Sequence, residues 1–216
     1  MLARIESPMA PEKQSRRSAT LLRHDSLELA LVDAAEMVIA ADGLFALRAR
    51  ALAEQVGCSV GAIYSVFPDL DAVILAVNAR TLAHIDVAMT DAGLVANPVG
   101  HLVHLATTYL DYAAGARQRW AALFLHTIGG GRKAPDWYAR RQAAAFSHIE
   151  APLGRLCPEL PPARRALLAR ALFSAVHGMV ALGLDEKVAA MSLPTLRQQV
   201  ATIVTATARG LAHGER

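Results

Sequence analysis

The chain has 216 residues, 54% of them hydrophobic and rich in Ala and Leu, which favours an all-α protein with a sizeable core. The net charge is only +3, and the two cysteines, Cys58 and Cys157, fit neither a metal motif nor a disulfide framework, which indicates a reducing compartment. The polar N-terminal segment argues against a signal peptide, and the apolar run 171–184 is shorter than the ~20 residues of a membrane span. We therefore expect a soluble cytoplasmic protein with no membrane partner.

Residues 1–24 contain two prolines, three serines and the basic cluster Lys13, Arg16 and Arg17. This composition argues against packing, so we predict a flexible basic arm. Two interpretations stay open: a solvated tail, or an arm that contacts phosphates or a minor groove of DNA.

From Ser26 the apolar residues recur at three- and four-residue steps, which predicts a helix that ends at Gly43. A second helix ends at Gly57, where the chain must reverse sharply. Ser59 can cap a short third helix that turns Ile63 inward. Two short helices around a tight turn are the layout of a helix-turn-helix, whose second helix enters a DNA major groove.

The third helix offers DNA a small and uncharged face. Ser65 and the Tyr64 hydroxyl can donate to phosphates or bases, and Val60 or Ala62 can contact a thymine methyl group. Because residues 57–67 carry no charge, arginine contacts must come from the preceding segment. The predicted DNA-binding residues are Arg48, Arg50, Ser59, Val60, Gly61, Ala62, Tyr64 and Ser65.

The distribution of charge gives no support for DNA binding. Residues 25–70 hold two basic and seven acidic residues, a net charge of −5, whereas residues 100–216 hold fourteen basic and seven acidic residues, a net charge of +7. The basic excess therefore lies mainly outside the predicted helix-turn-helix.

A fourth helix is expected to start near Asp69 or Asp71 and to run to about Asp91, bridging two parts of the chain. We take residues 25–70 as the helix-turn-helix domain and residues 71–216 as a helical effector-binding and dimerisation domain. Beyond a break at residues 92–98, the pattern predicts helices at about 99–114, 117–128, 135–157, 162–188 and 193–213. The expected fold is thus all-α, with about nine helices.

Residues 26 to about 72 resemble the N-terminal DNA-binding domain of TetR-type (TetR/AcrR) transcriptional regulators. The resemblance implies that residues 57–67 hold the turn and the recognition helix, and that Tyr64 contacts the phosphate backbone. Two departures remove polar groups that would face phosphates: Leu70 stands where the family usually has Lys, and Val66 where it often has a polar residue. The residues that carry the resemblance are Gly43, Leu47, Arg50, Leu52, Ala53, Val56, Gly57, Ser59, Gly61, Ile63, Tyr64 and Phe67.

Residues 120–125, 135–138 and 173–178 resemble, more weakly, a C-terminal subclass of the same family that often carries a Trp-aliphatic-aliphatic-His-Gly run; here Phe173 replaces the Trp. The resemblance implies a helical domain that dimerises and holds a small-molecule pocket. Small and apolar faces on the last two helices suit a four-helix interface in a homodimer, and burial of both helices in a monomer core is the alternative. The predicted interface residues are Ala171, Ala175, Gly178, Val200, Ile203, Val204, Thr207 and Leu211.

Large side chains among Ala-rich helices can line a cavity for an unidentified small-molecule effector, and for each of them core packing is the alternative. The candidates are Trp120, Phe124, Trp137, Tyr138, Phe146, His177 and Met179. His101 and His104 lie three residues apart and can share a metal ion, but no carboxylate or cysteine stands at a supporting spacing, so we predict neither a metal nor a cofactor.

The hypothesis that follows is a homodimeric, ligand-responsive regulator of transcription, a repressor that binds a palindromic site in double-stranded DNA. The alternative is a helical small-molecule or metal-binding protein with weakened DNA binding, which Leu70, Val66 and the local acidity favour. An all-α enzyme is not expected, because the chain has no nucleophile elbow, phosphate-binding loop or zinc-protease motif.

Overall fold

The computed structural model describes residues 11–187 and 191–214, and these residues form nine α-helices and two short 3₁₀ helices without any strand. The predicted all-α class is confirmed. The α-helices are α1 (Pro11–Asp42), α2 (Ala49–Val56), α3 (Val60–Val66), α4 (Leu70–Asp91), α5 (Pro98–Gly115), α6 (Arg117–Leu125), α7 (Asp136–Leu156), α8 (Pro162–Leu184) and α9 (Leu193–Gly214).

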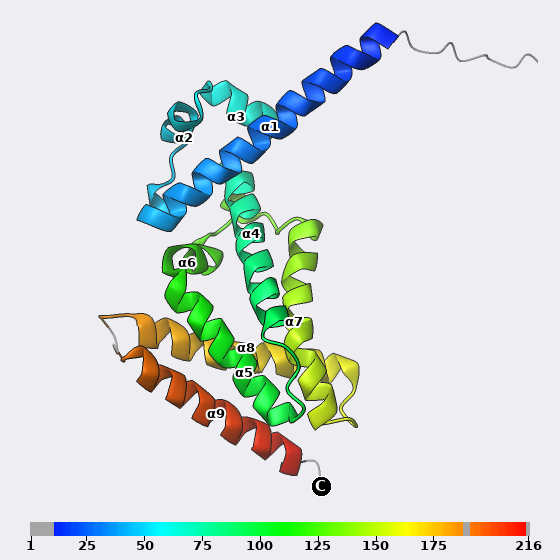
Figure 1. The fold of residues 1–216 in the computed structure, drawn as a ribbon, viewed down its shortest axis with the longest axis vertical. Coiled ribbons are helices and arrows are strands. Elements are labelled where there is room, and N and C mark those ends of the chain that lie inside the picture. Colours follow the sequence, from blue (N-terminus) through cyan, green and yellow to red (C-terminus); the bar gives the residue numbers. More distant parts are fainter. Residues whose placement is uncertain (1–10, 188–190, 215–216) are drawn as a thin grey trace, which may run out of the picture.

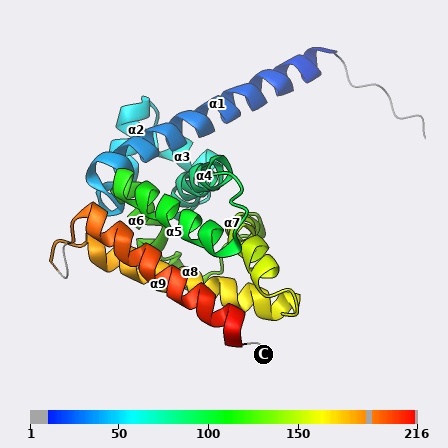
Figure 2. The same cartoon turned by 60° about the horizontal axis from the view of Figure 1, so that its bottom comes forward.

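Helix α1 begins at Pro11, so the prediction of a flexible arm is wrong for residues 11–24, and residues 1–10 of that arm lie outside the described residues. Proline suits the first turn of a helix, and no further Gly or Pro interrupts the helix before Asp42. Ser26 lies inside α1, where its Oγ donates to the Leu22 carbonyl over 2.7 Å instead of capping a helix. The N-terminal part of α1 projects away from the rest of the molecule (Figures 1 and 2).

The next two helices form the predicted helix-turn-helix. Gly57 ends α2 in the left-handed conformation, with φ 74° and ψ 34°, which glycine adopts at little cost. Ser59 caps α3, since its Oγ accepts a hydrogen bond from the Ala62 amide over 3.1 Å. Ile63 of α3 is fully buried against α1 and α2, which fixes the orientation of the third helix.

Helix α4 connects the two parts of the molecule, as predicted. Asp69 caps it by accepting from the Ala72 amide over 2.8 Å. Val73 and Val77 are buried in the core formed with α1, α2 and α3, which also contains Ala122 of α6. This first core therefore continues beyond residue 70 and includes the helix that lines the cavity described below.

The second core is built from α5, α6, α7, α8 and α9. Its helices match the predicted ranges, except that α6 ends at Leu125 instead of about residue 128, and α8 ends at Leu184 instead of about residue 188. Helix α8 stops because Asp185 has extended backbone angles, φ −82° and ψ 112°. In Figure 2, α8 and α9 lie side by side along one edge of the molecule.

Among the described residues, α4 and α8 are long and apolar enough to cross a membrane when length and composition alone are considered. Core helices of soluble proteins pass the same test. The burial of α4 in the first core accounts for its composition. The outer face of α8 is described below.

Candidate functional site

The recognition helix presents Tyr64 to solvent with 49% of its surface exposed, and Ser65 and Gly61 are also exposed. Val60 and Ala62 are only partly exposed, and Val60 packs against the first core. The Ser65 hydroxyl donates to the Ala62 carbonyl over 2.7 Å, so toward DNA it offers an acceptor rather than the predicted donor. The hydroxyls of Tyr64 and Ser59 donate to no described residue, and the Ser59 oxygen already accepts from the Ala62 amide.

The two candidate arginines differ in whether their guanidinium groups are already hydrogen-bonded within the protein. Arg48 Nη1 donates to the backbone carbonyls of Phe45 and Leu47, over 2.5 and 2.9 Å, so its guanidinium is held against its own chain. Arg50 is exposed on α2 and makes no hydrogen bond or ion pair with any described residue. Arg50 is therefore an exposed cation of the helix-turn-helix that no described carboxylate neutralises.

The acidity of residues 25–70 is partly neutralised by arginines from outside that segment. Three of its seven acidic side chains form ion pairs with arginines, with nitrogen–oxygen distances from 2.5 to 3.1 Å. The sequence-based charge count therefore overstates the repulsion of DNA. These pairs are Asp33 with Arg80, Glu36 with Arg80 and Arg119, and Asp69 with Arg132.

A second polar cluster fixes the start of α4, just after the recognition helix ends. Asp71 accepts hydrogen bonds from the Gly129 amide over 2.9 Å and from Arg132 over 3.0 Å, and its Oδ1 lies 3.0 Å from His126 Nε2. The hydrogen bond with His126 and that from Gly129 hold the pKa of Asp71 below its usual value. The α6–α7 connection is thereby tied to the helix that supports α3.

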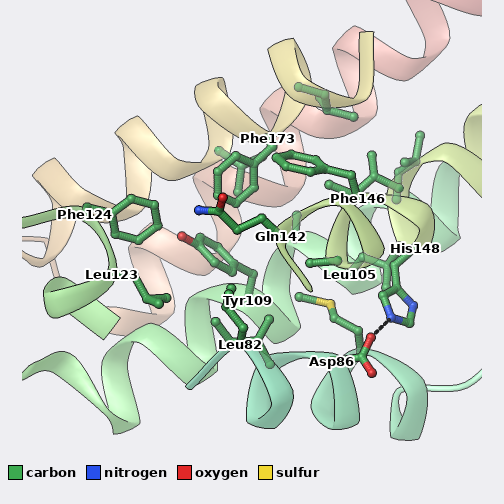
Figure 3. Close-up of a pocket in the computed structure, with 18 of the residues that line it drawn as sticks. Leu82, Asp86, Leu105, Tyr109, Leu123, Phe124, Gln142, Phe146, His148 and Phe173 are labelled. Atoms are coloured by element: carbon green, nitrogen blue, oxygen red, sulfur yellow. Dashed lines mark hydrogen bonds and ion pairs between the residues drawn. The ribbon is translucent and has the colours of Figure 1, made fainter. Parts of the chain in front are cut away.

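A cavity of about 270 Å³ lies between α4, α5, α6, α7 and α8. Figure 3 shows the Asp86–His148 pair, whose atoms are 2.7 Å apart, at one end, and Leu123 and Phe124 at the other. Gln142 extends its carboxamide into the space between them (Figure 3). Apart from these polar groups and the tyrosine hydroxyls, the walls are aliphatic and aromatic, which suits an apolar ligand.

Three of the seven predicted ligand residues, Phe124, Tyr138 and Phe146, line this cavity. The other four do not line it. Trp120 and His177 lie behind the wall, Trp137 is 42% exposed and packs edge-on against Tyr138, and Met179 packs against the second core.

Tyr109 of α5 is the main lining residue that sequence analysis missed. Its hydroxyl accepts from Trp120 Nε1 over 2.8 Å and lies 2.9 Å from His177 Nδ1. Burial raises the pKa of Tyr109 and lowers that of His177, which favours a neutral imidazole that accepts a hydrogen bond from the tyrosine hydroxyl. In the sequence, Tyr109 belongs to an apolar stripe on α5 whose helical spacing is typical of simple core packing, so the stripe did not indicate a cavity. The stripe consists of Leu102, Leu105, Ala106 and Tyr109.

A second cavity of about 380 Å³, more open to solvent, lies beside the first and reaches the α6–α7 connection. Its polar lining includes Asn78 of α4, His126 and Arg132. Both cavities share the side chains of Leu123, Tyr138 and Gln142 as walls. The two spaces are therefore neighbours that share part of their walls.

The two histidines considered as metal ligands, His101 and His104, each contact a different group of the protein. His101 Nδ1 lies 2.7 Å from Arg155 Nη2, and burial followed by the Arg155 charge lowers the His101 pKa. His104 Nε2 lies 2.9 Å from the Ala92 carbonyl. Neither ring is placed to share an ion with the other through these nitrogens.

The predicted dimer residues divide into two groups. Ala171, Ala175 and Thr207 are exposed, Gly178 is partly exposed and Ile203 is 45% exposed. The assignment is wrong for Val200 and Val204, which are fully buried in the protomer's own core, and Leu211 is half-buried against that core.

Helix α8 nevertheless has a continuous outer stripe of small and apolar residues. Leu167 and Leu182, which sequence analysis missed, are both more than half exposed and lie at the two ends of this stripe. The stripe follows helical spacing and consists of Leu167, Ala171, Ala175, Gly178 and Leu182. We call this stripe, together with Ile203 and Thr207 of α9, the α8–α9 face.

Two family models match the chain. One, described as bacterial regulatory proteins of the tetR family, matches residues 31–77, and the other, described as the Tetracyclin repressor-like C-terminal domain, matches residues 102–208. The first covers the helix-turn-helix, and the second covers most of the helices that surround the cavity. No curated protein matches the chain.

Several solved structures share the fold. A protein of unknown function from a Rhodococcus species is 20% identical with a TM-score of 0.68, covering 87% of this chain and 96% of its own. FadR from Bacillus subtilis, solved in complex with stearoyl-CoA, is 15% identical with a TM-score of 0.63, covering 82% and 97%. The TetR family transcriptional regulator PfmR from Thermus thermophilus is 16% identical with a TM-score of 0.58, also covering 82% and 97%.

Proposed function

The chain belongs to the TetR family of bacterial transcriptional regulators, and from this premise we propose that it is a homodimeric repressor released from a palindromic operator by a small-molecule effector. Members of this family generally regulate transcription by binding DNA. We further propose that the protein lies in the cytoplasm and catalyses no reaction.

The proposed DNA contact rests on the exposed tyrosine of a helix whose start and rotation are both fixed. Gly57 and Ser59 set the start of α3, buried Ile63 sets its rotation, and Tyr64 projects from the free side. A tyrosine hydroxyl donates well to a phosphate oxygen. Arg50 of α2 supplies an exposed positive charge that is paired with no described residue.

Dimerisation is proposed through the α8–α9 face. Exposed Leu167, Leu182 and Ile203 on two adjacent helices would be costly to leave in water, and two copies of the face can bury each other about a two-fold axis. Such symmetry would place two recognition helices on the two halves of a palindrome.

The effector is proposed to act through α6, since this helix both lines the cavity and contacts the DNA-binding part. Leu123 and Phe124 form a wall of the cavity, while Arg119 on the same helix binds Glu36 of α1. A ligand that shifts α6 would change the position of α1 relative to the second core, and hence the spacing of the recognition helices. The fold of FadR, solved with stearoyl-CoA, supports a small-molecule role for such a domain.

The test is an electrophoretic mobility shift with DNA from upstream of the protein's own gene. We expect salt-sensitive binding, loss of at least about tenfold in affinity for Tyr64→Ala, and unchanged affinity for Trp137→Ala, which removes a similarly exposed aromatic side chain from α7. Thermal unfolding of both variants checks that the fold is intact. If the protein shows no salt-sensitive binding to any promoter DNA, the proposal is excluded. That result would favour the second candidate function, a ligand-binding protein with weakened DNA binding, which the absence of charge on α3 supports.

A further inference from the structure

Asn78 on α4 has an unused hydrogen-bonding group at the second cavity. The residue is only 1% exposed, and its Oδ1 accepts no hydrogen bond from the described part of the chain. Its Nδ2 donates to the Ala122 carbonyl over 3.4 Å. An oxygen turned toward that carbonyl would be repelled, so the donor contact fixes the nitrogen there, and the residue lines the second cavity with its oxygen buried.

A buried acceptor without a donor is unfavourable, and proteins keep such groups where a ligand or water completes them. Tyr138 is the alternative partner inside the protein: burial raises the pKa of Tyr138 to about 12, and a side-chain hydrogen bond with Asn78 lowers it. No described residue, Tyr138 included, places a donor in normal hydrogen-bond geometry to the Asn78 oxygen. An additional donor group can therefore bind it.

The position of Asn78 relates this acceptor to the apolar cavity. Leu123, Tyr138 and Gln142 border both cavities, and a long, flexible Gln142 side chain can rotate out of the way at small cost. A ligand whose apolar body fills the first cavity can thus extend a polar end past Gln142 to Asn78.

We propose that the effector is an elongated apolar molecule that spans both cavities and donates a hydrogen bond from a terminal hydroxyl or amide group to Asn78 Oδ1. This inference rests on the proposed function, since it names the chemical class of the effector. The surrounding charges favour a neutral polar end: Arg132 is already paired with Asp69 and Asp71, and His126 contacts Asp71. A carboxylate would place acceptor oxygens against the acceptor oxygen of Asn78.

Two isomeric probes test the donor directly in the full-length protein. 1-Decanol carries a terminal hydroxyl donor, and methyl nonyl ether has the same formula without a donor. We expect calorimetric titration to give about tenfold tighter binding of the alcohol to the wild type. In Asn78→Leu, which keeps the branched shape and removes both the acceptor and the Nδ2 donor to Ala122, the preference should disappear while the ether binds at least as well as before.

Tyr138→Phe is the matched control, because it removes the neighbouring hydroxyl from the shared wall and should keep the preference for the alcohol. Loss of the preference in this variant would assign the contact to Tyr138 and overturn the role of Asn78. Equal binding of the two probes to the wild type, as expected if water alone satisfies Asn78, would overturn the proposal, and so would the absence of binding by either probe. Because no DNA is present, these results are independent of repression: binding of the alcohol without release of DNA would contradict the proposed effector response and leave the site intact.

Discussion

Arg119 of α6 donates from Nη1 to Glu36 Oε1 of α1 over 2.8 Å, and this contact links the wall of the cavity to the helix that supports the helix-turn-helix. Glu36 also accepts from Arg80 of α4 over 3.1 Å, so one carboxylate contacts two helices outside its own. Burial would raise the pKa of Glu36, but the hydrogen bonds from Arg119 and Arg80 outweigh it and the pKa is lowered. The ionised carboxylate therefore stabilises the relative position of three helices.

Glu36→Gln should lower the free energy of unfolding by about 1 to 2 kcal/mol at neutral pH, because it removes the charge from a half-buried carboxylate that binds two arginines. Asp33→Asn is the control, since Asp33 pairs with Arg80 alone and is mostly exposed, so its loss should change stability by less than about 0.5 kcal/mol. Urea denaturation with an unchanged m-value measures both effects. Equal losses in the two variants would contradict a special role for Glu36.

The Glu36 contribution should also depend on pH. Because its folded-state pKa is lowered from 4.5, the contribution is fully present above pH 4.5 and is lost as pH falls through the folded-state value. The stability difference between the wild type and Glu36→Gln should therefore shrink below pH 4.5. Denaturation curves at a series of acidic pH values, at constant ionic strength, check this; a constant difference would contradict the assignment.

The order of the helices and the helix-turn-helix were predictable from the sequence because local signals specify them: Gly57, Ser59 and Asp69 act at the positions where the chain turns or a helix begins. The length of α1 was not predictable in this way, since Ser26 is a good cap that here lies within a continuous run of helix formers.

The cavity was only partly predictable. Phe124 and Phe146 are large residues that suggested it, whereas Tyr109 belongs to a stripe with the same spacing as ordinary core residues. Val204 was assigned to the surface because periodicity shows that a helix has an apolar face but not which neighbour covers it. The pairing of Glu36 with Arg119 depends on contacts between distant segments and left no signal in the local charge count.

The two arginines near α3 should affect DNA binding differently. Arg50→Ala should reduce the slope of log affinity against log salt by about 0.9, because it removes one free phosphate contact. Arg48→Ala should change the slope less, since its guanidinium is bound to the Phe45 and Leu47 carbonyls, and should mainly lower stability. Fluorescence anisotropy with labelled operator DNA at several salt concentrations separates the two; equal slopes would show that Arg48 leaves its backbone contacts on binding.

Ile203→Glu should convert the proposed dimer to a folded monomer, because it introduces a charge into the centre of the α8–α9 face without disturbing the protomer core. Leu94→Glu is the control: Leu94 is 88% exposed but lies in the α4–α5 connection, away from that face. Light scattering coupled to size-exclusion chromatography gives the mass of each species. A dimeric Ile203→Glu protein would place the interface elsewhere.

Two tyrosines on α5 allow a matched test of the hydrogen bonds behind the cavity. Tyr109→Phe should lower the free energy of unfolding by about 1 to 3 kcal/mol, because Trp120 Nε1 loses its acceptor and His177 Nδ1 loses its donor inside the protein. Tyr112→Phe should be close to neutral, because the buried Tyr112 hydroxyl interacts only weakly with Thr81 and makes no hydrogen bond of normal geometry with any described residue. Both changes remove a single oxygen from the same helix, so thermal or urea denaturation compares the hydrogen bonds themselves; a loss in Tyr112→Phe as large as that in Tyr109→Phe would contradict this interpretation.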